Sequence, residues 1–417
     1  MIEKLKNLES FIKNKKAWQD FINQDFINQD FLNQDFPSKK IEEYKYLDLR
    51  FLADIDLKPI EEDLSAYLSK INKVEIDRLK KLFFDENEFN NIVFINGKFF
   101  EKFSNLPASL LISKIQNRSF EKLALKNLNL AFNKEILEFN FTKSLDKPIA
   151  FVHINTNNDA CLDVKKSQKS IYTNYKIAIE KNVQITMIEK FVNYEKNDFF
   201  NNNIFDYRLD SNSHLDHYIV QESKDNLQFN HYKIDLEDNA TYKSFLLNQK
   251  SKISRFDFEI NLNKIDSDAQ IRGIYLGENT QILDHYIKTN HNFEKTYSSH
   301  YLKGILKDKS KGSFYASSIA KKGVKKIVAN QLNKNILLDK ETVCYSSPEL
   351  WIKAEDVKCS HGATTGQLDK EAMFYLQSRG FSLEEAKKIL VKAFIDEIFE
   401  KISDKKIKKL LKSYLEE

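Results

Sequence analysis

Long apolar runs, a recognisable signal-peptide pattern and a strong excess of basic residues are all missing from this sequence of 417 residues. No run of about 18 apolar residues occurs, so we expect no transmembrane helix. The start, MIEKLKNLESFIKNKK, is charged throughout and lacks the apolar segment of a signal peptide. A net charge of +4 with 30% charged residues describes a mixed surface, which argues against a nucleic-acid-binding protein. We therefore expect neither a membrane nor a nucleic acid as a partner.

Cysteine, glycine and proline are also scarce, with three, nine and five residues respectively. The cysteines, Cys161, Cys344 and Cys359, are far apart and odd in number, which argues against a disulfide framework and fits a reducing cytoplasm. Glycine and proline usually make up about 7% and 5% of a chain, and an AT-rich genome would explain their low share without a functional cause. Phosphate-binding loops of the type G-x-x-x-x-G-K-[ST] or G-x-G-x-x-G are absent, so we expect this chain to bind no nucleotide itself.

The chain is long enough for two or three units of roughly 150 residues. Its N-terminal part has a mainly helical pattern. Residues 20–36, DFINQDFINQDFLNQDF, repeat every five residues, so their phenylalanines would spiral around a helix instead of forming a stripe. We interpret this repeat as a duplicated insertion. Residues 36–50 predict an amphipathic piece, and residues 119–140 predict a helix. Residues 92–100 predict a hairpin, because Asn96-Gly97 suits a type I′ turn.

From about residue 148 the apolar residues recur with a period of two, which is typical of half-buried strands. Residues 256–263 (FDFEINLN) alternate without fault, and residues 183–187 do the same. A longer period underlies this alternation, because a residue that tolerates left-handed backbone repeatedly precedes a small or β-branched one. These pairs are Asp159-Ala160, Asn182-Val183, Asn212-Ser213, Asn239-Ala240, Asp268-Ala269 and Gly323-Val324.

The spacing of these pairs predicts the fold of the central region. The first five are separated by 23, 30, 27 and 29 residues, and the last gap is 55 residues, about two such steps. A recurring unit of roughly 28 residues with strands and no helical pattern favours a β-solenoid. A β-sandwich also has regularly spaced turns and is the alternative.

The last 50 residues return to a helical pattern. The first helix of this region has an apolar face formed by Leu368, Ala372, Tyr375 and Leu376. Gly380 stands where a helix-ending glycine is common, and Ser382 with Glu385 forms a capping box for a second helix. The lysine-rich end, residues 405–417, carries a further apolar stripe. Its basic face suits an acidic partner or lipid headgroups, although a solvated helix face is the simpler interpretation.

The stretch EDVKCSHGATTGQLD at residues 355–369 carries the chain's most concentrated chemistry. Cys359 and His361 are two residues apart, so on a strand both side chains point to the same face. Zinc and iron accept both ligands, but two ligands do not complete a metal site. A Cys–His hydrolase would need an orienting group and an oxyanion hole, for which Gly362 and Gly366 supply backbone N–H groups. The third interpretation is a buried strand end that leads into a glycine corner.

The other histidines give no further ligand set. His214 and His217 are three residues apart and would face opposite sides of a strand, which argues against a joint role as ligands. We expect most of the remaining histidines to be surface or polar-core residues of strands: His153, His231, His285, His291 and His300.

Residues 348–380, PELWIKAEDVKCSHGATTGQLDKEAMFYLQSRG, resemble the most specific signature of the SufB/SufD family of iron–sulfur assembly proteins. Further segments resemble the family at residues 36–46 (FPSKKIEEYKY), 92–99 (IVFINGKF), 301–308 (YLKGILKD) and 330–339 (NQLNKNILLD). Gly362 follows His361, as in members of SufD type, where SufB has a glutamate. The sequence departs from the family at residues 323–326, which read GVKK in place of the usual A-Q-K-T, and the repeat at residues 20–36 is not part of the family pattern.

The resemblance implies a right-handed parallel β-helix core at residues 148–365. It implies an N-terminal helical or mixed region at residues 1–147 and a C-terminal helical region at 366–417 that docks the ATPase SufC. It also implies a heterodimer with SufB through the β-helix and two SufC subunits. The nascent iron–sulfur cluster would form at the interface with SufB, where His361 is the residue associated with the site and Cys359 a second candidate.

On this resemblance the chain is a scaffold subunit and not an enzyme. A neutral imidazole at His361 would ligate iron or relay a proton, and the missing ligands would belong to SufB. A flavin is associated with the whole complex in this family, but no residue here is assigned to it. The alternatives are a purely structural adaptor, an extracellular β-helix enzyme and a cytoplasmic Cys–His hydrolase.

Overall fold

The computed structural model describes residues 12–13, 15, 42–55, 57, 59–60, 73–116, 124–133, 135–156, 169–194 and 198–415. The five-residue repeat at 20–36, the corner at Asp159-Ala160 and Cys161 lie outside these residues. No described helix is both long and apolar enough to span a lipid bilayer.

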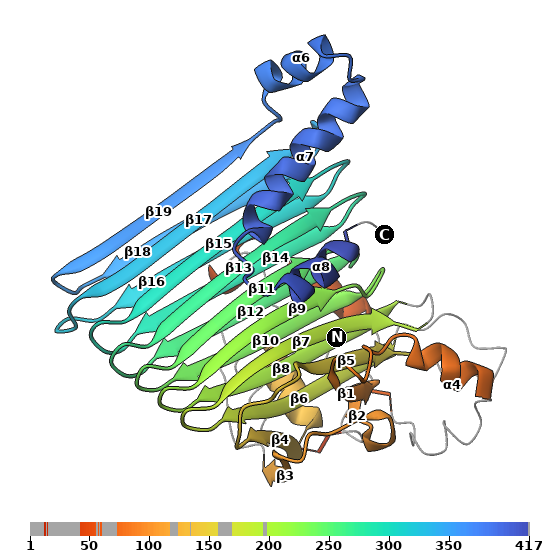
Figure 1. Cartoon of the computed structure of the whole chain (residues 1–417), viewed down its shortest axis with the longest axis vertical. Coiled ribbons are helices and arrows are strands. Elements are labelled where there is room, and N and C mark those ends of the chain that lie inside the picture. Colours follow the sequence, from red (N-terminus) through yellow and green to blue (C-terminus); the bar gives the residue numbers. More distant parts are fainter. Residues whose placement is uncertain are drawn as a thin grey trace.

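The described strands form two long sheets that lie face to face (Figure 1). One sheet contains, in spatial order, β19 (Val357–Gly366), β17 (Ile327–Leu337), β15 (Tyr297–Leu306), β13 (Asp268–Gly277), β11 (Thr241–Asn248), β9 (His214–Gln221), β7 (Gln184–Asn193), β5 (Ile149–Asn155), β1 (Asn90–Ile95) and β2 (Lys98–Phe99). The other contains β18 (Val343–Ile352), β16 (Lys311–Ala320), β14 (Ile282–His291), β12 (Ile253–Leu262), β10 (Leu227–Leu236), β8 (Phe199–Leu209), β6 (Lys169–Ile179), β4 (Glu135–Phe141) and β3 (Leu110–Gln116). We call these the odd sheet and the even sheet, after the strands of the core.

The core is the parallel β-helix predicted from the corner spacing and the family resemblance. Consecutive strands from β4 onward alternate between the two sheets, so each coil of the chain contributes one strand to each sheet. From β4 onward, neighbouring strands within a sheet are parallel; β10, for example, pairs with β8 and β12 in parallel register. A β-sandwich is built from antiparallel sheets, so this parallel pairing excludes the alternative.

The corners between coils follow the predicted backbone rule with two corrections. Asn182, Asn212 and Asn239 have φ values of 63°, 59° and 53°, as predicted for residues that accept left-handed backbone. The corner predicted at Asp268 lies two residues earlier, at Asp266 with φ of 57°, because Asp268 already begins β13. The gap of two steps contains a corner at Lys295, with φ of 54°. Lysine is not a residue that favours this conformation, so the sequence contained no signal for it.

Hydrogen bonds between successive corners hold the coils in register. The backbone N–H of Asn182 donates to the carbonyl of Ser211, and the side-chain amide of Asn212 donates to that of Asn182 at 3.1 Å. The amide of Asn239 continues this ladder by donating to Asn212 at 2.9 Å. Stacked asparagine amides stabilise parallel, in-register strands, because each amide is both donor and acceptor.

Two short elements test the predictions for the N-terminal region. The hairpin is confirmed: β1 and β2 pair antiparallel, and Asn96 and Gly97 have φ of 49° and 77°. The helix predicted over 119–140 is only partly correct. Helix α5 covers Ala124–Phe132, but β4 then pairs with β3 and β6 and completes the first coils. Pairing with β3 and β6 therefore outweighs the helical pattern of the sequence in this segment.

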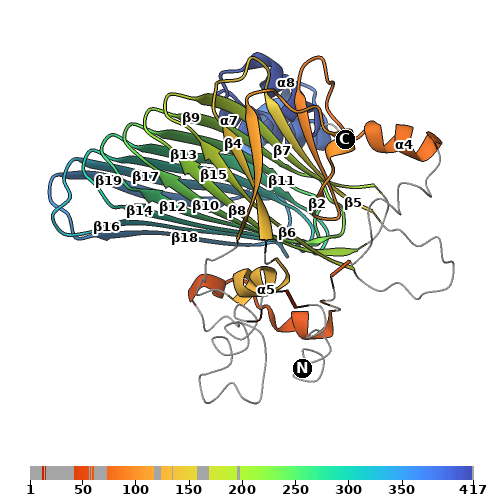
Figure 2. The ribbon, with the colours of Figure 1, turned by 90° about the horizontal axis from the view of Figure 1, so that it is seen from below.

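The outer faces of both sheets are covered by different parts of the chain (Figure 2). The N-terminal elements η2 (Glu42–Tyr44), η3 (Arg50–Asp54) and α5 pack on the even sheet, where Leu52 and Leu128 contact the apolar cluster around Phe229. The C-terminal helices α7 (Leu383–Phe399) and α8 (Lys405–Ser413) pack on the odd sheet, around Phe245. The remaining short helices are α4 (Lys73–Lys80), η4 (Glu101–Phe103) and α6 (Lys370–Ser378).

The interior of the β-helix is aromatic at its start and becomes polar toward its end. Phe94, Phe151 and Tyr175 contact one another in the first coils. The last coils instead bury His300 and Gln331, at 1% and 2% exposure. The end that carries β18 and β19 therefore has a polar interior.

A buried carboxylate organises the aromatic part of this interior. Glu189 of β7 is fully buried; its Oε1 lies 3.1 Å from His153 Nε2, and its Oε2 lies 3.3 Å from His217 Nε2. The hydroxyls of Tyr232 and Tyr175 also donate to this carboxylate. Burial opposes the ionisation of Glu189, but the hydrogen bonds from His153 and His217 outweigh it and lower the pKa to about 2.

Replacing this carboxylate should destabilise the core. We expect Glu189→Leu to reduce the free energy of unfolding by about 3–5 kcal/mol, because it leaves buried donors without an acceptor. Glu278→Leu, at an exposed ion pair with Lys307, should change it by less than about 0.5 kcal/mol. In the wild type this stabilisation should be complete above the unfolded-state pKa of about 4.3 and be lost as the pH falls toward 2. Urea unfolding of both variants tests this, and equal midpoints would contradict it.

Candidate functional site

Both sheets stop at the C-terminal end of the β-helix. β18 pairs with β16 and β19 pairs with β17, and no described strand continues either sheet beyond them (Figure 1). Most residues of β8, β10 and β12 are buried, whereas those of β18 and β19 are half-buried or exposed. Two ten-residue edges of unpaired backbone therefore face outward. Such edges are templates for pairing with another chain.

His361 of β19 is the accessible imidazole of this chain. All eight histidines lie within the described residues; His361 alone is exposed, His214 is half-buried and the other six are buried. The pair His214 and His217 behaves as predicted, since His217 points inward and His214 bonds to Asp216 at 3.0 Å. The expectation that most of the histidines are surface or polar-core residues of strands is confirmed, and the buried ones are polar-core residues.

The hydrogen bond of His361 identifies the tautomer of its neutral ring. Its Nδ1 lies 2.9 Å from the carbonyl oxygen of Pro348 on β18, across the interior of the last coil. A carbonyl only accepts, so Nδ1 carries the hydrogen, and in the neutral ring Nε2 keeps its lone pair. Histidine ligands of metals are commonly oriented by such a bond from the other ring nitrogen to a backbone carbonyl. The ring is therefore set up to accept a proton or a metal ion at Nε2.

Cys359 lies on the same strand and face, as predicted. It pairs in register with Ala329 of β17 and is half-buried. Burial raises the pKa of its thiol above the usual value. The thiolate is the form that binds metals and attacks electrophiles, so Cys359 is less ready than His361 to act at neutral pH.

Polar side chains of the two preceding coils lie next to His361 inside the β-helix. Gln331 of β17 pairs with His361 in register, and His300 of β15 pairs with Gln331. The Gln331 amide donates to the carbonyl of Glu349 at 3.1 Å and to Ser318 Oγ at 2.9 Å. Residues of β15, β17 and β19, His361 among them, line a pocket of about 340 Å³ here.

The structure does not bring the other candidate ligands to this place. Cys344 also points into the last coil, but its sulfur lies 3.7 Å from the Tyr275 hydroxyl. It is four residues along β18 from Pro348, the residue that faces His361. Among the described residues, no group of three or more histidine, cysteine or acidic side chains is arranged to hold a metal ion.

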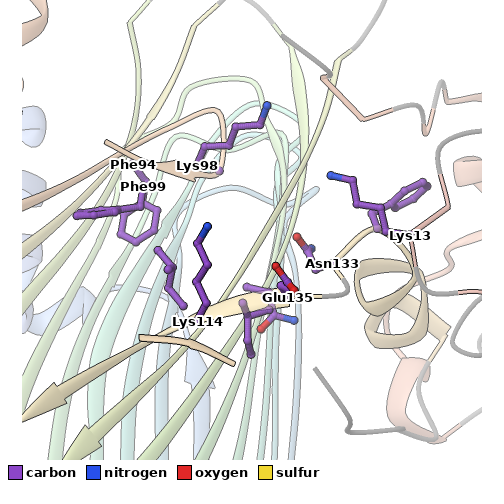
Figure 3. Close-up of a pocket in the computed structure, with 12 residues that line it drawn as sticks. Lys13, Phe94, Lys98, Phe99, Lys114, Asn133 and Glu135 are labelled. Carbon is purple, nitrogen blue, oxygen red and sulfur yellow. The ribbon is translucent and has the colours of Figure 1, made fainter. Parts of the chain in front are cut away.

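A larger pocket of about 730 Å³ lies at the other end of the β-helix (Figure 3). It is lined by the β1–β2 hairpin, β4 and the end of α5, and the side chains of Lys13, Lys98 and Lys114 line it together with Phe94 and Phe99. The order of strands in the odd sheet separates it from β19 by the full length of that sheet. It is not connected with His361.

The C-terminal helices carry an apolar surface that nothing in the described chain covers. Helix α6 stands beyond the ends of the strands and packs on α7 (Figure 1). The predicted capping box of Ser382 with Glu385 and the helix-ending Gly380, with φ of 94°, are both confirmed. The large exposed apolar side chains here are Phe374, Tyr375, Phe381, Leu383 and Ile389.

The other end of α7 is fixed to the odd sheet by an ion cluster. The Lys303 ammonium group of β15 is buried and donates to Glu397 of α7 at 2.7 Å and to the carbonyl of Phe394 at 2.6 Å. Lys334 of β17 and the hydroxyl of Tyr301 also bond to Glu397. Desolvation opposes ionisation of Glu397, but the hydrogen bonds from Lys303 and Tyr301 lower its pKa to about 2.

Removing this carboxylate should loosen α7 from the sheet. Glu397→Ala leaves the buried Lys303 without its anionic partner, and we expect the docking of α7 to weaken by about 1–2 kcal/mol. Hydrogen exchange of residues in α7 should speed up about tenfold, while exchange in β10 and β12 stays unchanged. Glu384→Ala, at an exposed pair with Lys387, is the matched control. Unchanged exchange in α7 would contradict the role of the cluster.

These observations define a class: a parallel β-helix with helices on its C-terminal end, whose last coil presents an oriented histidine that is not joined by a full set of metal ligands from the described residues. Comparison with known proteins agrees. The family model described as "SUF system FeS cluster assembly, SufBD core domain" matches residues 162–394, more than half of the chain. The chain therefore belongs to the SufBD family of the SUF iron–sulfur cluster assembly system.

Individual relatives support this membership. An iron–sulfur cluster assembly SufBD family protein of Synechocystis is 24% identical over 388 residues, which cover 87% of this chain and 83% of that protein. The iron–sulfur cluster assembly protein SufD of Escherichia coli is 29% identical over 265 residues, which cover 63% of this chain and 61% of that protein. SufD of Plasmodium falciparum is 26% identical over 265 residues, 59% of this chain and 18% of that protein.

Sequence reasoning missed the partner of His361. The Pro348 carbonyl is a backbone group, and no side-chain pattern identifies which backbone oxygen will face a given residue across a coil. The spacing of Pro348 and His361 alone contained no usable signal.

Proposed function

We propose that this chain is a scaffold subunit without ATPase activity, acting in the cytoplasm, on which iron–sulfur clusters are assembled at an interface with a SufB partner. A SufC ATPase would dock on the C-terminal helices and drive the process. Membership of the SufBD family supports the assembly role, and the names of the relatives favour the SufD type.

The observation that best supports this proposal is the hydrogen bonding of His361. Its Nδ1–H is engaged by Pro348, its exposed Nε2 is free to accept, and it lies on the edge coil. One imidazole and one protonated thiol do not hold an iron ion by themselves. Ligands from a second chain at the same edge would complete the site, and a shared, incomplete site lets the finished cluster leave.

The unpaired edges of β18 and β19 support the heterodimer. A partner whose own β-helix ends in parallel strands would continue both sheets through main-chain hydrogen bonds. Pro348 fits an edge strand, because the N–H group that proline lacks is not needed where no neighbouring strand lies.

The C-terminal surface supports docking of the ATPase. The exposed apolar residues of α6 and α7 form a patch where a partner helix or groove would bury them. Because Lys303 and Lys334 join α7 to β15 and β17, a pull on α6 and α7 would reach the sheet that contains His361. The neutral imidazole would then ligate the iron substrate or relay a proton during cluster formation.

Three further parts of this proposal rest on the resemblance alone. They are the division of the chain at residues 147 and 365, a flavin in the complex and a direct role for Cys359. The second candidate function is a structural adaptor that presents the edge strands and the helices but takes no part in cluster chemistry. The long unpaired edges of β18 and β19 favour a structural adaptor as much as they favour the assembly role.

Replacing His361 separates these two functions. His361→Ala should lower cluster formation by about tenfold or more, measured as iron and acid-labile sulfide in the complex purified with SufB and SufC, and as growth of cells that depend on this chain. The amount of complex should not change, since the side chain is exposed. His214→Ala is the control. Cluster formation at the wild-type level in His361→Ala would favour the structural adaptor.

The docking surface gives a second prediction. Phe374→Ser, alone or with Leu383→Ser, should reduce the SufC recovered with this chain by about tenfold, because central apolar contacts dominate protein interfaces. Recovery of SufB should stay unchanged. Leu111→Ser replaces a leucine of β3 whose exposure, 57%, lies between those of Leu383 (48%) and Phe374 (73%), and it should leave both partners bound. Loss of SufB together with SufC would point to a damaged fold, and full recovery of SufC would disprove this surface.

A further inference from the structure

An N-terminal tyrosine reaches the last coil of the β-helix. The ring of Tyr46 stacks on Tyr345 of β18, with ring centroids 4.8 Å apart and an interplanar angle of 10°. Its hydroxyl donates to Ser347 Oγ at 2.9 Å. A segment near the start of the chain therefore contacts the outer face of the even sheet at its final strand.

A second tyrosine supports the same stretch of β18. The hydroxyl of Tyr315 on β16 donates to Glu349 at 2.9 Å and lies 3.3 Å from Glu42, in the same N-terminal segment as Tyr46. The Tyr315 ring stacks on Tyr286 of β14 at 5.0 Å. Ser347 and Glu349 are thus both held from the outside.

Pro348, the residue between them, is the partner of His361. Its carbonyl accepts from His361 Nδ1, and the neighbouring carbonyl of Glu349 accepts from Gln331. Residues 347–349 form one short piece of backbone. The side chains of residues 347 and 349 bond outward, and the carbonyls of residues 348 and 349 bond inward. The N-terminal segment contacts this piece of backbone from outside the coil. The orientation of His361 depends on the same piece from inside the coil.

An edge strand needs such support more than an inner strand does. β18 has a ladder neighbour, β16, on one side, while β10 and β12 have neighbours on both. The position of an inner strand is fixed by two ladders of hydrogen bonds, whereas that of an edge strand depends on one ladder and on side-chain contacts. Tyr46 supplies a stacked ring and a hydrogen bond to this strand.

We infer that Tyr46 is a positioning residue for His361. By holding β18 through Tyr345 and Ser347, it keeps the Pro348 carbonyl where it selects the ring tautomer with hydrogen on Nδ1 and a free Nε2. Its effect on cluster assembly rests on the function proposed above for His361. Its effect on the tautomer does not.

The tautomer is measured directly on the full-length chain with histidine labelled with ¹⁵N in the ring, by long-range ¹H–¹⁵N correlation. The His361 signals are assigned by their loss in His361→Gln. In the wild type Nδ1 should be protonated and Nε2 unprotonated. Tyr46→Ala should raise the fraction of the opposite tautomer by about fivefold or more, because fivefold is the lower end of the factor expected for losing one stacked pair and one hydrogen bond.

Conservative variants keep the test independent of folding. Tyr46→Phe keeps the stacked ring, and Ser347→Ala removes only the acceptor, so each should cause a smaller change in the same direction. Tyr297→Phe is the matched control, because this half-buried tyrosine of β15 has no hydrogen bond from its hydroxyl within the described structure. An unchanged His361 tautomer in all the Tyr46 and Ser347 variants would overturn the inference.

Cluster assembly in the same variants tests the link to function. It should fall in the order of the tautomer change, with Tyr46→Ala lower than Tyr46→Phe. If His361→Ala loses assembly while Tyr46→Ala shifts the tautomer and assembles normally, the positioning of His361 by Tyr46 stands, and its link to cluster assembly is overturned. If His361→Ala assembles normally, the proposed function fails, and the tautomer measurement still decides the role of Tyr46.

Discussion

The parallel ladder between successive coils is the interaction on which the rest of this structure depends. Each coil satisfies the backbone groups of the coil before it, and it leaves its own outward groups for the coil that follows. A β-helix built this way has an obligatory edge wherever it stops. In this chain the edge is formed by β18 and β19, and it carries the exposed histidine. The location of the candidate site is thus a consequence of where the solenoid ends.

The layers outside the sheets belong to the same arrangement. The N-terminal elements cover the even sheet, and the C-terminal helices cover the odd sheet, so both sheets are buried on two sides over most of their length. Each layer also reaches toward the final coil. Tyr46 contacts β18, while α7 is joined to β15 and β17 by Lys303 and Lys334. The N-terminal and C-terminal regions therefore contact the strands around the candidate site from the outer faces of opposite sheets.

The sequence predicted the repeating parts of the fold well and the irregular parts poorly. Asparagine corners such as Asn182 and Asn239 were predictable, because few residues accept left-handed backbone at low cost. The corner at Lys295 was not, because its conformation is imposed by the stacked coils and not by the side chain. The strand β4 was taken for helix for a similar reason, since its neighbours β3 and β6 determine its shape. His361 and Cys359 were found on one strand face as predicted, but the Pro348 carbonyl that orients the imidazole was beyond any sequence pattern.

The last coil has a thermodynamic property that follows from its single neighbour. In a solenoid, stability is close to a sum of terms for each repeat and for each interface between repeats. An inner coil is stabilised by two interfaces, while the coil that contains β18 and β19 has one. It therefore opens at a lower free energy than an inner coil, while the rest of the ladder stays intact. On the function proposed above, iron and sulfur would enter and leave at an end coil, which opens more easily than the inner coils.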